Sequence, residues 1–457
     1  MANIVDENAK PAIDELLDGF KPVSYDLRCS DTTFIDYFPI SGCGSGVTSL
    51  RWVIPKPKGN FVNLINKMVI AMELKLTNSQ GTSTPPIDLK SGPCNNFALS
   101  IFSDLRIAFN NTNVVKIQDY HIYSYLKTIL TCNDNDMNTW CETRCIANED
   151  RNEDLDTFGT KGFTARRNFF GGIVKASGPH QGKFVFSPMA NFFIATIDHP
   201  LPSPPLLPCD VSVELQLNNV NRVFQSINDS AKDINFAFEK VRLIIPQARL
   251  SDKLYLSIEN RLAKQALRQY FTNTEINTHS IATGSKTGEF DSICSGKNPS
   301  RLFVLFQATD HYMGKLDKNV FKYSRVFNEG GTGGSFLLQS VKCFLKGNEI
   351  ERLNCDESLH SFRDQYFRLF ELTQSAGQCC SITFDDFKSR SLIFVFDLTA
   401  TLSNTSYPML PLVKEGHLRL TCEFSAPSLI PITMITVAEI QSSVVIENTG
   451  RCTLSSI

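Results

Sequence analysis

Hydrophobic and polar positions follow the same order in two stretches of the chain, about half a chain apart. In the first stretch, residues 102–130, apolar side chains alternate with others as in a half-buried strand; these are Leu105, Ile107 and Phe109. Asn110-Asn111 comes next and predicts a turn, because asparagine tolerates a positive φ. A short strand over 114–117 and a helix over 119–130 complete the unit, the helix being indicated by apolar residues at helical spacing.

The second stretch, residues 337–370, repeats this unit. Its strand is marked by Val341, Cys343 and Leu345. Gly347-Asn348 is predicted to form the turn, and Ser361 to cap the helix. Aligning Leu105 with Val341 gives an offset of 236 residues (341 − 105). A strand–turn–strand–helix unit repeated once predicts two copies of one fold. The two helices should then occupy equivalent places, the first as a lid-like insertion on its barrel.

Many other short segments have strand patterns bounded by turn residues. They are 33–40, 50–54, 67–76, 183–186, 211–217, 235–250, 268–281, 301–308, 322–328, 392–398, 417–424, 433–440 and 444–447. Many strands with two or three helices indicate a mainly β chain of sandwich or jelly-roll domains. Residues 251–266 combine helical spacing with an absence of glycine and proline, which predicts a helical connector between the halves.

Composition narrows the classes of partner. The formal net charge is −2, from 45 basic and 47 acidic residues. Phosphate binding needs an excess of lysine and arginine, so no sequence-specific nucleic-acid partner is predicted. The longest apolar stretch, 429–440, is too short to span a membrane. The N-terminus has no apolar segment of the secretory type, so the fourteen cysteines are expected to be reduced thiols inside a cell.

No local motif predicts chemistry. The glycine-rich segments 42–46 and 330–334 are not followed by Lys-Ser/Thr or by a helical pattern, so both are predicted to be loops rather than phosphate cradles. Cys141 and Cys145, with Cys132 nearby, have no histidine close downstream, and a zinc site is not favoured. The seven histidines are dispersed. We therefore predict no catalytic, cofactor-binding or metal-ligating residues, no cofactor and no enzymatic activity.

The charged clusters are expected to be solvated. Arg166-Arg167, like Lys240 with Arg242, is predicted to lie at the surface or in an interface. The pairs Asp385-Asp386 and Glu149-Asp150 are predicted to be solvated turns or helix starts. Residues 131–181, acidic and rich in turns, form a long excursion from the β pattern that is predicted to lie at the surface and is a candidate for making contacts.

Five segments of the second half follow one another in a specific order: RLFVLFQATDHYMG, FKYSRVFNEGGTGGSFLLQSVKCFLKGNEIE, SFRDQYFRLFEL, SITFDDFKSRSLIFVFDLTATL and GHLRLTCEFSAPSLIPITMITVAEIQSSVVIEN. The first half adds FIDYFPI, NNFALSIFSDLRIAFNNTNVV and the long strand at 235–250. In this order the segments resemble the major capsid proteins of Polinton/Maverick elements, adintoviruses and related viruses. The resemblance covers nearly the whole chain, except residues 131–181.

The resemblance implies a double jelly roll, that is, two tandem jelly-roll β-barrels with a few short helices. The domains are then an N-terminal arm at 1–29, a first jelly roll at 30–250, a helical connector at 251–266 and a second jelly roll at 267–457. It also implies a homotrimer that forms a pseudo-hexameric capsomer of an icosahedral shell. The expected partners are neighbouring capsomers and a single jelly-roll penton protein, and the expected location is the virion, assembled inside the host cell.

Two other classes of protein fit a jelly-roll chain. One is a binding module, lectin-like or receptor-binding, without catalysis. The other is a cupin-like metalloenzyme, which would need two or three histidines and a carboxylate converging inside one barrel; the dispersed histidines disfavour it.

Overall fold

A computed structural model gives the arrangement of most of the chain. It describes residues 29–77, 91–147, 149, 153–169, 181–188, 209–227, 234–294, 298–328, 334–355, 361–373, 382–399 and 416–456. The N-terminal arm predicted for 1–29 lies outside these residues except for Cys29, and so does the glycine-rich loop at 330–334 except for Gly334.

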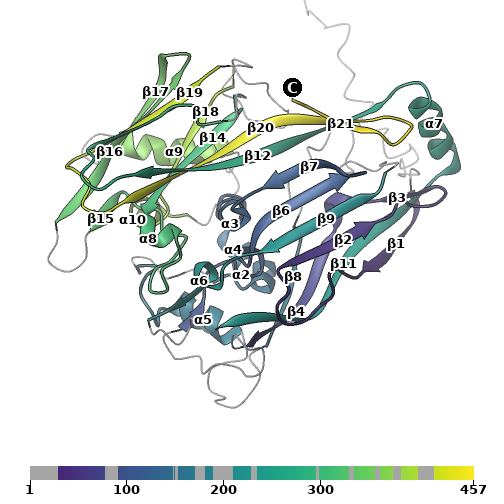
Figure 1. Cartoon of the computed structure of the whole chain (residues 1–457), viewed down its shortest axis with the longest axis horizontal. Coiled ribbons are helices and arrows are strands. Elements are labelled where there is room, and N and C mark those ends of the chain that lie inside the picture. Colours follow the sequence, from purple (N-terminus) through teal and green to yellow (C-terminus); the bar gives the residue numbers. More distant parts are fainter. Residues whose placement is uncertain are drawn as a thin grey trace, which may run out of the picture.

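Two four-stranded antiparallel sheets form the core of the first half (Figure 1). One sheet runs in the order β1 (Cys29–Tyr37), β11 (Asn235–Leu250), β4 (Val69–Thr77) and β8 (Gln181–Phe186), with β3 (Phe61–Asn63) added beside β11. The other runs β2 (Ser49–Ile54), β9 (Val211–Leu217), β6 (Phe102–Phe109) and β7 (Thr112–Ile117). Counted along the eight main strands, these orders are 1-8-3-6 and 2-7-4-5, the jelly-roll topology.

The second half has the same two orders. Its first sheet runs β12 (Leu267–Ile281), β20 (Ile432–Ile446), β14 (Arg301–Ala308) and β18 (Ile393–Asp397). Its second runs β13 (Thr287–Phe290), β19 (Leu418–Phe424), β16 (Ser335–Leu345) and β17 (Asn348–Asn354). Short strands β15 (Val326–Asn328) and β21 (Cys452–Ser456) are added at β16 and β20, while β5 (Ser91–Pro93) and β10 (Phe224–Ser226) form a separate pair. The fold is a double jelly roll.

The duplication extends to single residues. The pairing of β6 with β9 is shifted by a bulge after Phe102, and that of β16 with β19 after Leu338, an offset of 236 residues (338 − 102). The pairing of β6 with β7 is shifted after Ile107, and that of β16 with β17 after Cys343, again 236 residues (343 − 107). Because a bulge changes the twist and direction of its strand, its retention at both positions supports two copies of one barrel.

The turns of the repeated hairpin also correspond, with one correction. Asn110 and Asn111 have φ of 45° and 68°, as the predicted turn requires. In the second copy the turn residues are Lys346 and Gly347, with φ of 53° and 83°, whereas Asn348 already begins β17. The prediction of a Gly347-Asn348 turn was wrong by one residue, because glycine is favoured at either central position of a type I′ turn.

Other predicted elements changed mainly in their ends. The strands predicted at 433–440 and 444–447 are one strand, β20, because both parts pair continuously with β12. Only the last three residues of the strand predicted at 322–328 are extended, as β15. The helix predicted at 251–266 is present as α7 (Asp252–Leu262), which packs on a small cluster with β3 and β11.

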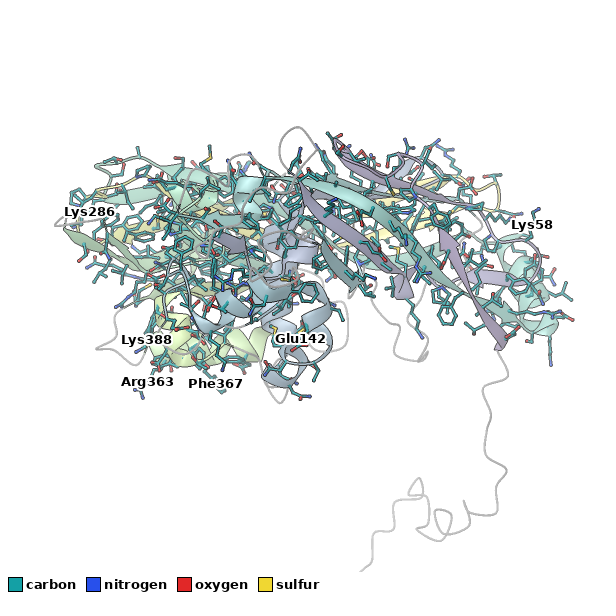
Figure 2. The ribbon with its side chains drawn as sticks, turned by 90° about the horizontal axis from the view of Figure 1, so that it is seen from below. Lys58, Glu142, Lys286, Arg363, Phe367 and Lys388 are labelled. Atoms are coloured by element: carbon teal, nitrogen blue, oxygen red, sulfur yellow. The ribbon has the colours of Figure 1, made fainter. Side chains whose placement is uncertain are left out.

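The remaining helices lie mostly in the connections between the fifth and sixth strand of each barrel. In the first barrel these are α3 (Tyr120–Thr131), α4 (Asp134–Met137), η3 (Trp140–Arg144) and α5 (Lys161–Phe169), and in the second α9 (Ser361–Thr373) and α10 (Phe384–Ser389). Short pieces elsewhere are η2 (Ile65–Lys67), α2 (Phe97–Ser100), α6 (Val220–Val223) and α8 (Thr309–Tyr312). Glu142 of η3 and Phe367 of α9 lie on the same side of the molecule (Figure 2).

The two long helices hold the same place in the chain order but not the same environment. Helix α9 packs on strands β17 and β18 and on helix α10, all of its own barrel, and its Phe367 is 65% exposed. Ten of the twelve residues of α3 are buried. The prediction that the first helix is a lid on one barrel is wrong, because α3 lies between the two barrels.

We expect Lys346→Asn to stabilise the protein by about 0.5–1 kcal/mol. Lysine has a Cβ that is strained at positive φ, whereas Asn-Gly is the preferred type I′ dipeptide. Urea denaturation of full-length protein measures the change. Lys342→Asn, in the adjacent strand β16, is the control and should lose stability, because asparagine is a poor strand former. Equal effects of the two substitutions would contradict the turn assignment.

Candidate functional site: the interface between the barrels

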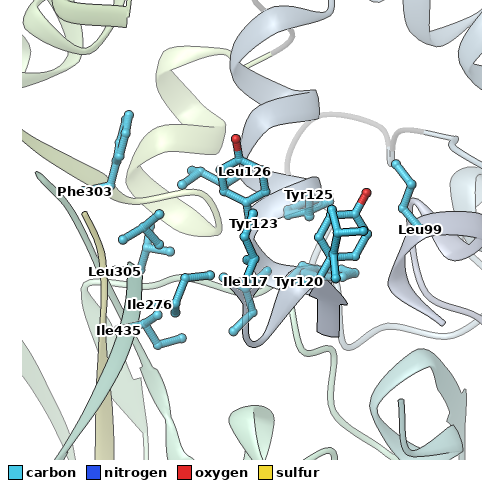
Figure 3. Close-up of a cluster of buried hydrophobic side chains, with 14 of the residues drawn as sticks. Leu99, Ile117, Tyr120, Tyr123, Tyr125, Leu126, Ile276, Phe303, Leu305 and Ile435 are labelled. Carbon is cyan, nitrogen blue, oxygen red and sulfur yellow. The ribbon is translucent and has the colours of Figure 1, made fainter. Parts of the chain in front are cut away.

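Helix α3 and the end of strand β7, which precedes it, form the apolar centre of the interface between the barrels (Figure 3). The side chains from the first barrel are Ile117, Tyr123 and Leu126. They face a row from the second barrel: Ile276, Phe303, Leu305 and Ile435. All seven are buried. Behind them, the ring of Tyr125 stacks on Phe321 of the second barrel with 4.1 Å between centroids. Burial of this apolar surface favours a fixed contact between the barrels.

An ion triad with a buried carboxylate and two half-buried cations lies beside the apolar centre. Glu439 of β20 is paired with Lys127 of α3, and Arg301 Nε lies 2.8 Å from its Oε2. The side chain of Glu439 is only 3% exposed. Burial alone would raise the pKa of Glu439, but Arg301 and Lys127 together hold it at about 2. The carboxylate is therefore charged at neutral pH and joins α3 of one barrel to two strands of the other.

A second polar contact is centred on Asp119, directly before α3. Its carboxylate accepts hydrogen bonds from Arg222 Nη1 at 3.2 Å and from the hydroxyl of Tyr312, on the second barrel, at 3.1 Å. Burial raises the pKa of Asp119 despite Arg222. His121 lies next to it, fully buried, with no hydrogen-bond partner at either ring nitrogen. Desolvation lowers the pKa of His121 to about 3, so its ring is neutral.

The acidic segment between η3 and α5 contacts the second barrel through Asp156. The carboxylate of Asp156 accepts from His311 Nε2 at 3.0 Å, Lys322 Nζ at 2.9 Å and the backbone N–H of Asn319 at 2.8 Å. Burial would raise the pKa of Asp156, but His311 and Lys322 hold it far below its ordinary value. Asp154 lies 2.7 Å from the same lysine.

Two arginines hold this segment in place. Arg166 of α5 is buried and donates to Glu149 Oε1 at 2.7 Å, to the carbonyl of Ala147 at 2.6 Å and to that of Pro93 at 3.2 Å. Arg390, which ends α10 of the second barrel, donates to the carbonyls of Glu153 at 2.8 Å and Glu149 at 3.3 Å.

The solvated placement predicted for Glu149 was therefore wrong, and Arg166 is buried rather than at the surface. For 131–181, the prediction of a contact-making segment is confirmed in this part, since it is bonded to the second barrel. The sequence shows a charged, turn-rich stretch, but Asp156 is neutralised by Lys322, 166 residues away in the chain. The backbone carbonyl of Glu149 accepts from Arg390, 241 residues away.

The other singled-out positions are placed as follows. Lys240 and Arg242 are exposed and pair with Glu73 and Asp36, in agreement with surface charges. Asp386 starts α10 through a reciprocal capping box with Thr383, as the helix-start alternative requires. Within the described residues, no group of three or more His, Cys, Asp or Glu side chains is placed to hold a metal ion. Cys132 and Cys145 are buried.

A polar groove of about 780 Å³ opens between the barrels near the start of α3. Its charged and titratable lining comprises Asp104, Asp119, Arg222, Glu275, His279, Cys294 and His417. The hydroxyl of Ser292 lies 3.4 Å from His417 Nδ1 at its edge. No helix in the described part of the chain is long and apolar enough to cross a membrane.

Exposed aromatic side chains on β1 and just after it are a feature that the strand pattern did not reveal. Phe34, Phe38 and Ile40 are 71%, 72% and 67% exposed. Strand β1 is the outermost strand of its sheet, and no other strand of the described residues pairs with its outer edge. Exposed apolar patches on an edge strand are typical of contact surfaces. The only sequence signal was the unusual number of large apolar residues in 33–40.

No protein-family model matches the sequence, and no curated protein does. Several solved structures are similar to this chain. A chain in the cryo-EM structure of the Sputnik virophage has a TM-score of 0.60 at 12% identity, covering 100% of this chain and 92% of its own length. A chain of the PBCV-1 virus capsid has a TM-score of 0.55 at 12% identity, covering 96% and 100%. The faustovirus major capsid protein has 0.54 at 9% identity, covering 93% and 92%.

These similar structures are double jelly-roll major capsid proteins. At such low identity the likeness establishes the fold, over nearly the full length of this chain and of each of the others.

We expect Glu439→Gln to lower the free energy of unfolding by about 2 kcal/mol at pH 7, because it removes the charge-assisted hydrogen bonds that the half-buried Lys127 and Arg301 donate to this carboxylate. The folded pKa of Glu439, about 2, lies below its ordinary value of 4.5, so its contribution is present above pH 4.5 and is lost as the pH falls toward 2. The variant should lack this acid dependence. Urea titrations from pH 7 to 3 measure both effects. Glu289→Gln, exposed on β13, should change neither.

We expect His121→Leu to raise the free energy of unfolding, by about 1 kcal/mol at pH 7.5, because it removes two unsatisfied buried nitrogens. The folded pKa of about 3 lies below the ordinary 6.5, so the unfolded chain takes up a proton first as the pH falls. The advantage of leucine should then grow by about 1.4 kcal/mol per pH unit below 6.5.

Thermal and urea unfolding at pH 7.5 and 5.5 check this expectation. Asp119 and Arg222 face the ring and remain in the variant. His417→Leu, at an exposed position, is the control. An advantage that stays the same at both pH values would show that His121 is not held neutral.

Proposed function

We propose that this protein is the major subunit of an icosahedral capsid. The observation that carries the proposal is the duplicated jelly roll, which corresponds over 93–100% of this chain to chains from a virophage, the PBCV-1 capsid and faustovirus. The same comparisons favour a capsid subunit over a jelly-roll binding module, and structural capsid subunits need no catalytic site.

The subunit would act as a homotrimer. Two similar barrels per chain and three chains place six similar units around a threefold axis, and such a pseudo-hexamer can tile a shell with six neighbours. This role requires a fixed angle between the two barrels. The buried apolar centre, the Glu439 triad and the Asp156 contacts would maintain that angle.

Finer assignments follow from the sequence resemblance. We propose a capsid of the Polinton/Maverick and adintovirus type, located in the virion, with neighbouring capsomers and a single jelly-roll penton protein as partners. The domains are proposed to be 1–29, 30–250, 251–266 and 267–457. Near-neutral charge suits a wall in which neighbouring subunits approach closely, and it does not favour sequence-specific nucleic-acid binding.

The apolar patch on β1, formed by Phe34, Phe38 and Ile40, is proposed to be covered by a second copy of the chain. Aromatic side chains exposed by 71% and 72% on an unpaired sheet edge would favour self-association. This surface gives the oligomer a residue-level test.

Light scattering and negative-stain microscopy of the full chain should give a trimer with a pseudo-hexagonal outline. The double variant Phe34→Ser, Phe38→Ser should stay folded by circular dichroism and shift to monomer at concentrations at least tenfold higher than wild type. Met313→Ser, at a residue 64% exposed on the other barrel, should remain trimeric. A monomeric wild-type chain would overturn the capsid proposal. A trimeric double variant would overturn only the assignment of the patch.

A further inference from the structure

The C-terminal strand of the second barrel lies against the first barrel. Strands β12 and β20 extend across the first barrel alongside β7 and carry β21 with them (Figure 1). The hydroxyl of Thr112 donates to the carbonyl of Cys452 at 3.1 Å, and Asn110 Nδ2 donates to that of Gly450 at 2.6 Å. The same asparagine accepts from the backbone N–H of Asp210 at 2.8 Å, and its own N–H donates to Asp210 O at 3.0 Å. One turn therefore holds residue 210 and residues 450–452 together.

Two thiols meet at this point. Cys209 directly precedes Asp210, and its thiol lies close enough to that of Cys452 for the two to affect each other electrostatically. Cys452 Sγ donates to the carbonyl of Gly450 at 3.5 Å, which holds it at the same turn. They are 2% and 7% exposed. Both are free thiols in the structure. They come from opposite halves of the chain, 243 residues apart (452 − 209).

We propose that Cys209 and Cys452 form a disulfide under oxidising conditions and thereby fasten the C-terminal strand of the second barrel to the first barrel. The proposal goes beyond the capsid assignment and does not depend on it, because it concerns the contact between two halves of one chain.

The reaction needs an oxidant, for which a small-molecule disulfide of the glutathione type suffices. The thiolate of Cys452 attacks the small disulfide, forms a mixed disulfide and releases one small thiolate. The thiolate of Cys209 then attacks the sulfur of Cys452 and releases the second. The two cysteines lose two electrons and two protons, and the oxidant becomes two thiols.

The structure also determines when this reaction can occur. Burial raises the pKa of both thiols, which keeps them protonated and unreactive while β21 is in place. Among the described strands, β21 pairs with β20 alone, over five residue pairs, and Cys452 is its first residue. A short strand that is paired along one edge opens locally at lower cost than a central strand. Opening would expose Cys452 to the oxidant, and reclosing would return it to Cys209.

The bond would act on stability as well as on position. A disulfide restricts the unfolded chain more as the loop it closes becomes longer, and this loop would include most of the second barrel. Once formed, it would prevent β21 from leaving the first barrel without reduction.

The test equilibrates full-length protein with graded ratios of reduced and oxidised glutathione, followed by an acid quench, alkylation of free thiols and peptide mapping by mass spectrometry. We expect a single intramolecular cross-link joining the peptides that contain Cys209 and Cys452. The oxidised protein should have a Tm roughly 5 °C above that of the reduced protein.

Cys209→Ala and Cys452→Ala, made separately, should each abolish the cross-link and the redox dependence of Tm. Cys355→Ala is the matched control, since this buried thiol lies beside Arg325 rather than another cysteine, and it should retain both. Alkylation of both thiols after full oxidation would overturn the proposal. So would a cross-link between other cysteines in place of this one, or an oxidised form that is no more stable than the reduced form.

Discussion

The burial of helix α3 between the barrels is the constraint on which the rest of the structure depends. A helix that is buried on nearly every side cannot leave charged groups unpaired, because desolvation of an unpaired charge costs several kcal/mol. Lys127 therefore needs Glu439, and Asp119 needs Arg222 and Tyr312. Separating the barrels would expose the apolar centre and remove these partners in the same step, which favours a single fixed arrangement.

The two barrels are copies in their sheets and differ in their connections. Strand order, bulges and the hairpin turn repeat at one offset, since these features determine whether the barrel closes. The connection after the fifth strand is freer to change. In the first barrel this connection contains helix α3 and the acidic segment, which contact the other barrel. In the second barrel it contains the partly exposed helix α9, with Phe367 on its surface. A chain with two similar but distinguishable barrels results.

Local pattern was sufficient where the physical cause is local. Alternating residues located β9 and β11 with their observed bounds, because one face of each strand packs on the core. The predicted ends of strands were less accurate. Gly347 is compatible with two turn registers, and the pairing of β16 with β17 selects one of them. The split of β20 into two predicted strands has the same origin: the interruption in its pattern is bridged by continuous pairing with β12.

The sequence by itself determined the class of fold, the duplication and the absence of a recognisable catalytic motif, because these depend on periodicity and spacing within short windows. Only the tertiary structure decided which charges are buried. Arg166 and Glu149 come from a stretch with the composition of a solvated loop, yet they form a buried ion pair 17 residues apart in the chain. Asp156, from the same stretch, is neutralised by His311 and Lys322, which lie 155 and 166 residues away. The meeting of Cys209 with Cys452 is of the same kind. Pairings across such distances are set by how the barrels pack, which no local window contains.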